Sequence, residues 1–147
     1  MKRLLALLLT TLLPTSAAAQ TSAWEADPTE SVVGIHVIPN FGDDPTQYSP
    51  EITEAAVRSA LSSVDWVTGF HQVVVVLSPG TSMEVGGSLN PEHGLSGVYR
   101  NRREGIHAVT REAPEALSDL EAILLAFIKP GEGWKKVQEF EFWHGGR

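Results

Sequence analysis

The amino-acid sequence predicts an α+β two-layer sandwich, in which a mostly antiparallel sheet of about five to six strands carries two amphipathic helices on one face. The segment HQVVVVLS at residues 71–78 has the continuous apolar run of a strand that is covered on both faces. Two longer segments have apolar residues at helical spacing. Short alternating segments bounded by turn residues make up the rest, and they give the order β-α-β-β-β-β-α-β.

The first strand is expected at residues 31–39, SVVGIHVIP, where apolar side chains alternate along the chain. The Gly, Pro, Asn and Asp content of residues 40–48 predicts a loop. Ser49 and Pro50 then suit the N-cap and first position of a helix. One apolar face of that helix is formed by residues at i, i+3, i+4 and i+7: Val57, Ala60, Leu61 and Val64.

The central part of the chain reads as strands. After residues 71–78, another strand is expected at residues 82–89, where Gly86 and Gly87 indicate a bulge or a close approach of two backbones. Residues 95–100 and 106–111 flank a short charged turn and predict a hairpin.

The last two elements are a second helix and a final strand. Ser118 and Glu121 have capping-box spacing, and WKKVQEFEFW at residues 134–143 alternates like a strand with one charged face. The apolar stripe of the helix is expected to comprise Leu117, Leu120, Ile123, Leu124, Phe127 and Ile128.

Residues 1–19 have the three parts of a secretory signal peptide: Lys2 and Arg3, an apolar run of about ten residues that is too short for a permanent anchor, and the small residues before Gln20. We expect cleavage before Gln20, a flexible leader at residues 20–30 and one α+β domain at residues 31–147. The protein is therefore expected to be exported, periplasmic or secreted, with no membrane anchor after cleavage.

The formal charge of the whole chain is −7, and removal of the signal peptide leaves 9 basic and 18 acidic residues. Nucleic acid would repel a domain this acidic, whereas a basic partner would be attracted. The chain has no cysteine, which excludes a thiol nucleophile and a thiolate metal site. The five histidines lack the short spacing of metal ligands, so neither a metal nor another cofactor is expected.

Two loops carry candidate functional residues. Glu92 and His93 place an acid beside an imidazole and are the best candidates for acid–base catalysis, although the surrounding Asn-Pro and His-Gly pairs are also ordinary turn chemistry. Asp43 and Asp44 are candidates for binding, and so is Trp143, which lies near the C-terminus with little core to reach.

Residues 82–143 contain four segments in a fixed order. They are the glycine-bearing run Met83–Ser88, the segment Gly94–Tyr99, a helix that starts at Pro114–Leu117 and continues to Phe127, and a strand that opens with Trp134. This succession resembles the small α+β immunity proteins of bacterial toxin–immunity systems. The resemblance implies a non-catalytic protein that binds a cognate toxin through an acidic face and needs no cofactor. Export further implies a target outside the cytoplasm.

Two functions follow. One is a non-catalytic binding protein, of inhibitor or immunity type, that recognises a basic exported enzyme or toxin and uses Asp43, Asp44, Glu92, His93 and Trp143. The alternative is a small exported hydrolase in which Glu92 and His93 act with His36 or His107. An exposed last strand would also allow a homodimer.

Overall fold

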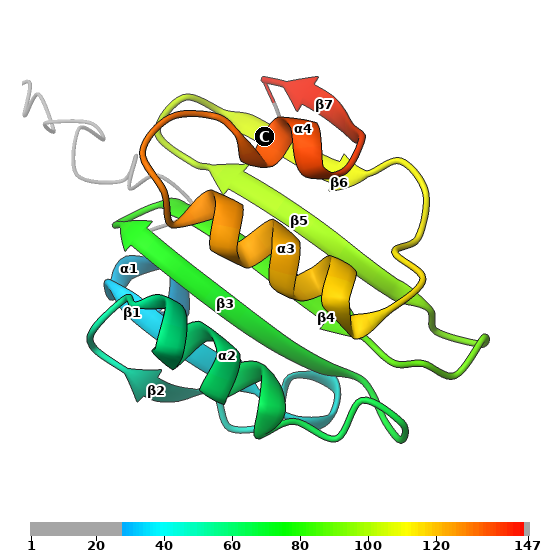
Figure 1. The fold of residues 1–147 in the computed structure, drawn as a ribbon. Helices are drawn as coiled ribbons and strands as arrows, with labels where there is room; N and C mark the ends of the chain where they lie inside the picture. The colour runs from blue at the N-terminus through cyan, green and yellow to red at the C-terminus, as the bar shows by residue number, and fades with distance from the viewer. Residues whose placement is uncertain (1–27, 146–147) are drawn as a thin grey trace, which may run out of the picture.

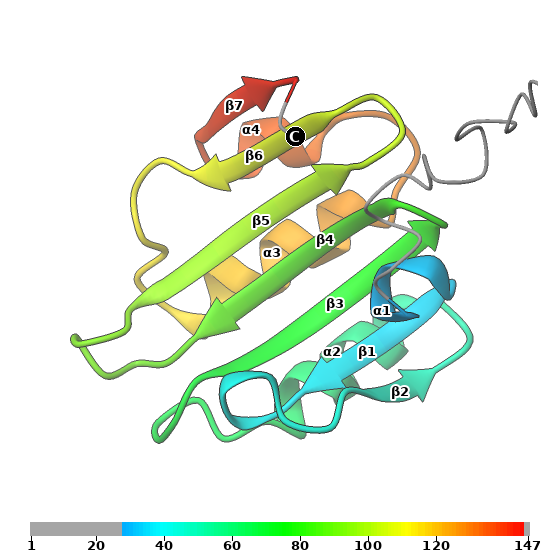
Figure 2. The same ribbon diagram turned by 180° about the vertical axis from the view of Figure 1, so that it is seen from behind.

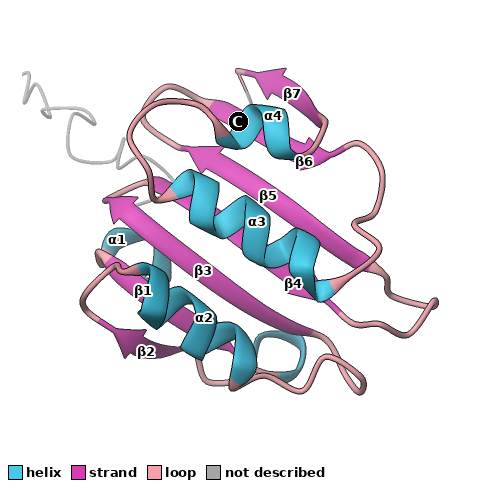
Figure 3. Ribbon diagram, in the orientation of Figure 1, coloured by secondary structure: helices cyan, strands magenta, loops and turns pink. Residues whose placement is uncertain are grey.

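The computed structural model describes residues 28–145, which form one seven-stranded antiparallel sheet in the order β2-β1-β3-β4-β5-β6-β7. Helices α2 and α3 lie side by side on one face of this sheet (Figure 1). Figure 3 separates the helical layer from the strand layer by colour. The predicted α+β class with two helices on one face is therefore confirmed.

The strands are β1 Gly34–Ile38, β2 Thr46–Ser49, β3 His71–Ser78, β4 Thr81–Gly87, β5 Leu95–Asn101, β6 Ile106–Thr110 and β7 Phe140–His144. The helical segments are α1 Pro28–Ser31, the 3-10 turn η2 Asn40–Gly42, α2 Glu54–Ser62, α3 Leu117–Phe127 and α4 Trp134–Val137. No helix in the described part of the chain is long and apolar enough to span a membrane.

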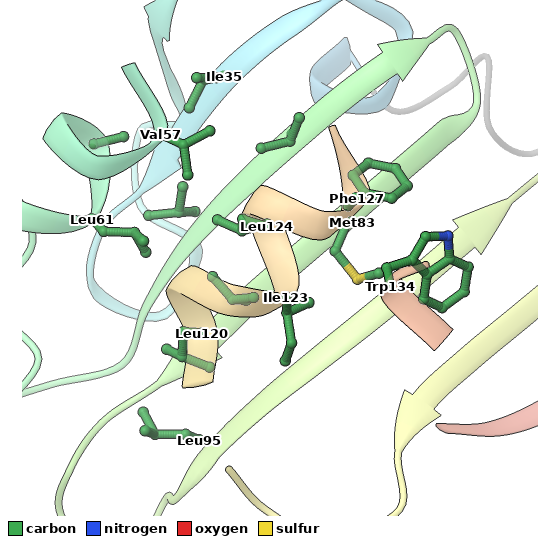
Figure 4. Packing of buried hydrophobic residues seen from close by; sticks show 14 of the residues in the cluster. Ile35, Val57, Leu61, Met83, Leu95, Leu120, Ile123, Leu124, Phe127 and Trp134 are labelled. Carbon is green, nitrogen blue, oxygen red and sulfur yellow. The ribbon is translucent and has the colours of Figure 1, made fainter. Parts of the chain in front are cut away.

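The core lies between the sheet and its helices (Figure 4). Val73 and Val75 of β3 point into it, and the alternation of a strand sends Val74 and Val76 to the opposite face. All four valines are at most 2% exposed, as expected for a strand covered on both sides. The helices contribute buried side chains from one face each: Val57, Ala60 and Leu61 from α2, and Leu120, Ile123, Leu124 and Phe127 from α3.

The start of α2 differs from its prediction. Thr53 is the N-cap, and its hydroxyl accepts a hydrogen bond from the Ala56 amide at 3.1 Å. Ser49 instead ends β2, an exposed edge strand within the segment predicted as a loop. Its polar sequence TQYS has no apolar alternation, because an edge strand with little burial needs none.

Helix α3 also begins differently. Asp119 accepts hydrogen bonds from the backbone amides of Glu115 and Ala116, at 3.1 and 3.0 Å, in place of the predicted Ser118–Glu121 box. Leu117, assigned to the apolar stripe, is 38% exposed. The stripe itself begins with Leu120.

The predicted strand 134–143 begins as a helix. Residues Trp134–Val137 form α4, and only Phe140–His144 form β7. The turn lets Trp134 enter the core, where its ring contacts Tyr99 at 4.5 Å and Phe140 at 5.0 Å between centroids. Burial of one large aromatic side chain thus decides the local structure against the alternating pattern.

Helix α1 lies on the sheet face opposite α2 and α3 (Figure 2). Residues 28–30 were predicted as part of a flexible leader, but they begin this helical turn, and Glu30 is 4% exposed. The predicted signal peptide at residues 1–19 and the leader residues 20–27 lie outside the described residues.

Gly87 explains part of the predicted irregularity at the end of β4. Its φ is +110°, and a Cβ there would lie 1.8 Å from the Gly94 carbonyl oxygen. Only glycine fits this approach between the two ends of the 88–94 loop. The prediction of a close backbone approach is therefore confirmed.

Candidate functional site

Three loops meet at one end of the sheet, which we call the loop end: residues 39–45 after β1, residues 63–70 before β3, and residues 88–94 between β4 and β5. They lie along the lower right of the view in Figure 1. The antiparallel register requires this meeting, because β1 ends where β3 begins and β4 ends. Hydrogen bonds join the loops, from the Phe41 amide to the Phe70 carbonyl at 2.8 Å and from the Leu89 amide to the Trp66 carbonyl at 2.7 Å.

An aromatic cluster of Phe41, Phe70 and His93 lies on this end, with one ring from each loop. The Phe41 and Phe70 rings stack with centroids 5.8 Å apart, and the His93 ring meets them edge-on at 5.5 and 6.0 Å. The cluster lines an open depression of about 390 Å³ together with Gln72. Sequentially distant loops therefore present one continuous aromatic surface.

Phe41 is 66% exposed and Val67 is 64% exposed, the two highest values for large apolar side chains in residues 28–145. Leu89, in the third loop, is 45% exposed. Large apolar side chains gathered on one exposed surface are typical of a contact site for another molecule.

The backbone at Phe41 is in the left-handed region, with φ 62° and ψ 31°, and Asn40 has φ 41°. Residues other than glycine rarely adopt this conformation, and it persists only where surrounding contacts hold it. Contacts with neighbouring residues therefore hold the 39–45 loop in a conformation that leaves the Phe41 ring exposed.

The loops that carry the aromatic cluster are also acidic. The three loops contain four of them, Asp43, Asp44, Asp65 and Glu92, and no lysine or arginine. The carboxylates of Asp43, Asp44 and Glu92 form no hydrogen bond or ion pair with any residue that the structure describes. They are therefore available to a cationic group of a partner.

Asp65 has a local role instead. Its carboxylate accepts hydrogen bonds from the Thr68 hydroxyl at 2.5 Å and from the amides of Val67 and Thr68 at 2.9 and 3.2 Å. These bonds, the Thr68 hydroxyl first, lower the pKa of Asp65 below its ordinary value. The charged carboxylate closes the turn that carries Val67.

Among residues 28–145, no hydrogen bond or ion pair joins the Glu92 carboxylate to the His93 ring. The Glu92 amide donates to the side-chain oxygen of Asn90 at 3.1 Å, which is ordinary turn chemistry, and the His93 ring contacts the two phenylalanine rings. The turn interpretation of this loop is therefore the one that the contacts support.

The proposed third members of a catalytic group lie elsewhere. His36 on β1 forms a hydrogen bond with the Val32 carbonyl at 2.8 Å, and His107 is on β6. No ring contact or hydrogen bond joins either of them to His93 among residues 28–145. Within the same residues, no three His, Asp or Glu side chains come together as a possible metal site.

Trp143 is 46% exposed but lies away from the loop end, on the edge strand β7. Phe140 and Phe142 of β7 face the core, so Trp143 faces the opposite side of the sheet, where its ring meets His107 at 5.7 Å. Burial and the nearby charges of Arg100 and Arg102, in that order, lower the pKa of His107.

Sequence reasoning missed Phe41 and Phe70. Each was visible as an isolated aromatic residue, one inside the polar turn NFGDD and one just before the valine strand. Neither signal is specific, because aromatic residues next to strands usually enter the core. Only the register of the sheet brings the two rings together.

Comparison of the chain with protein-family models, with curated proteins and with solved structures finds no match.

Proposed function

We propose that this protein is an exported, non-catalytic binding protein whose loop end docks on a basic exported enzyme or toxin. The observation that carries the proposal is the aromatic cluster of Phe41, Phe70 and His93 with its exposed Phe41 ring, on loops that also carry carboxylates without a partner among residues 28–145. Four of the five binding residues expected from the sequence, Asp43, Asp44, Glu92 and His93, belong to these loops.

The chemistry of this surface favours a protein partner. Aromatic side chains dominate the energy of protein interfaces, because they bury a large area with little loss of side-chain entropy. Acids around them attract a basic partner and raise the association rate. An arginine of the partner would stack on the exposed Phe41 ring while its guanidinium binds Asp43 or Asp44.

An inhibitor or immunity role fits the remaining features. The signal peptide expected at residues 1–19 would place the protein where exported hydrolases and toxins act. A protein of this kind neutralises its target by covering it, and it needs neither a cofactor nor a reacting group. The aromatic surroundings of His93 favour a contact surface over a hydrolase site, since a general base needs a polar partner to orient it.

The test begins with capture of envelope proteins on the immobilised mature chain, residues 20–147, at low salt and at high salt. The proposal predicts a basic partner that binds at low salt and is released by high salt. After purification of that partner, Asp43→Asn with Asp44→Asn should slow association roughly threefold or more at low salt.

A matched control removes two acids from the opposite end of the molecule, Glu51→Gln with Glu104→Gln, and should leave the association rate unchanged. An empty capture at both salt concentrations would contradict the proposal. An equal effect of both double variants would show that total charge, and not the loop end, determines binding.

A further inference from the structure

We propose that His71 is a positioning residue that holds the Phe41 loop in its docking conformation only while the imidazole ring of His71 is neutral. Protonation of His71 would then release the loop. The effect on partner binding rests on the proposed function, whereas the effect on the loop itself does not.

The hydrogen bonds of His71 fix its protonation state. The Asn40 amide donates to His71 Nδ1 at 3.2 Å, and His71 Nε2 lies 2.9 Å from the Thr68 carbonyl oxygen. A carbonyl oxygen can only accept, so Nε2 carries the proton and Nδ1 offers its lone pair. The pair of bonds therefore requires the neutral ring, with His71 bridging the 63–70 loop and the Phe41 loop.

A protonated ring could not keep both bonds. Each nitrogen of an imidazolium is a donor, so Nδ1–H would face the Asn40 N–H and the bond between them would be lost. Asn40 and Phe41 both have left-handed backbones, at φ 41° and 62°, and such conformations depend on neighbouring contacts. Within the described residues, the Phe41 amide would then be the one remaining backbone link from this segment to the 63–70 loop, through the Phe70 carbonyl, while the Gly42 and Asp43 amides keep their bonds to the Pro39 carbonyl within the turn.

Gly69 allows the close contact between the 63–70 loop and the Phe41 loop on which these hydrogen bonds depend. Gly69 has φ +78°, and a Cβ there would lie 2.6 Å from Asn40 Oδ1 and 3.1 Å from His71 Nε2. Glycine at this position lets the turn before β3 close directly on Asn40, so the imidazole can reach the Asn40 amide.

The charged groups around His71 come mainly from one loop. Asp65, in the 63–70 loop, is the acid whose charge interacts with the ring. The residue opposite His71 on β4 is Gly87, and its neighbour in the Phe41 loop is the Asn40 backbone, so neither of these carries a charge. Asp65 would attract an imidazolium but offers no acceptor to Asn40.

The experiment is nuclear magnetic resonance of the labelled mature protein from about pH 8 to about pH 5, a range that covers ordinary histidine titration. The ring signals of His71 report its own protonation. In step with it, amide exchange of Asn40, corrected for its intrinsic pH dependence, should rise roughly fivefold, the size expected for one lost hydrogen bond. Contacts between the Phe41 and Phe70 rings should weaken. An Asn40 amide that stays protected after His71 is protonated would overturn the proposal.

Two variants separate the effect of His71 from that of the other histidine at the loop end, His93. His71→Asn places an uncharged acceptor near the position of Nδ1, so Asn40 protection and the ring contacts should become independent of pH. His71→Leu removes the acceptor and should release the loop even at high pH. A pH response that persists in His71→Asn would overturn the proposal.

The binding measurement distinguishes the two proposals. With the purified partner, weaker binding at low pH in wild type but not in His71→Asn supports the positioning role. If Phe41→Ala abolishes binding while the pH profiles of wild type and His71→Asn coincide, the proposed function stands and the role of His71 falls.

Discussion

Glu30 of α1 and Arg102, which are 72 residues apart in the sequence, form a two-point ion pair. Arg102 Nε donates to one carboxylate oxygen at 2.8 Å and Nη2 to the other at 3.2 Å. Arg100 lies 3.6 Å from the same carboxylate, and the Gly80 amide binds the Glu30 carbonyl at 3.0 Å. The Gly80 bond therefore joins the start of the described chain to the β3–β4 turn, and the ion pair joins it to the β5–β6 turn.

Loss of the Glu30 charge should destabilise the fold. The Glu30 side chain is 5% exposed and Arg102 is 38% exposed, so the pair is only partly screened by water. Glu30→Gln should lower the free energy of unfolding by roughly 1–3 kcal/mol, as for hydrogen bonds to charged groups. Urea unfolding measures this, with exposed Glu51→Gln as the control. Equal stability of the two variants would contradict the structural role of the pair.

Thr53, and not Ser49, should act as the cap of α2. Thr53→Ala removes the acceptor for the Ala56 amide and should cost about 1 kcal/mol of folding stability. Ser49→Ala removes two exposed local bonds, from the Glu51 amide and to the Glu51 carbonyl, but no bond to the first turn of α2, and should cost less. Denaturant midpoints of the two variants test this order, and a larger loss in Ser49→Ala would favour the helix start predicted from the sequence.

His107 should make the fold less stable in acid. Its pKa in the folded protein is below the ordinary 6.5, so the folded state binds this proton less readily than the unfolded chain does. The contribution to stability is complete above pH 6.5 and is lost as the pH falls through the lowered pKa. As the pH falls from about 8 to about 5, the unfolding free energy of wild type should decrease relative to that of His107→Gln, which has no group to protonate at this position. A difference that stays constant would show that His107 does not contribute to this pH dependence.

Gly87→Ala should be severe, because its Cβ would collide with the Gly94 carbonyl and its φ is left-handed. We expect a loss of at least about 2 kcal/mol in folding stability. Gly131→Ala is the matched control, since Gly131 has φ +90° but nothing within 4 Å of the added carbon. If both variants lose the same stability, backbone strain alone accounts for the loss and the collision does not.

The sequence predicts best where burial follows a regular pattern. The valines of β3 and the apolar face of α2 lie where their spacing places them. Strand β2 was not predicted because an exposed edge strand needs no apolar alternation. Helix α4 was predicted as a strand because its sequence alternates, but burial of the Trp134 side chain favours the helical turn. Glu30 was assigned to a leader because its arginine partners are distant in the sequence.

The candidate site was predictable only in part. Turn chemistry points to the loops that contain Asp43 and His93, since functional residues often lie on such loops. Their meeting depends on the long-range register of β1, β3 and β4, which no local pattern reveals. The same register adds Phe41 to the site and leaves Trp143 outside it.

Binding of the purified partner to two alanine variants tests the central claim most directly. Phe41→Ala removes the exposed phenylalanine ring of the loop end, whereas Trp143→Ala removes an exposed aromatic side chain from the edge strand β7. Calorimetry should show a Kd that rises about tenfold or more for Phe41→Ala, as for an interface hot spot. The Kd for Trp143→Ala should stay within about twofold of wild type. An unchanged Kd for Phe41→Ala with a large loss for Trp143→Ala would place the interface on β7 and contradict the account.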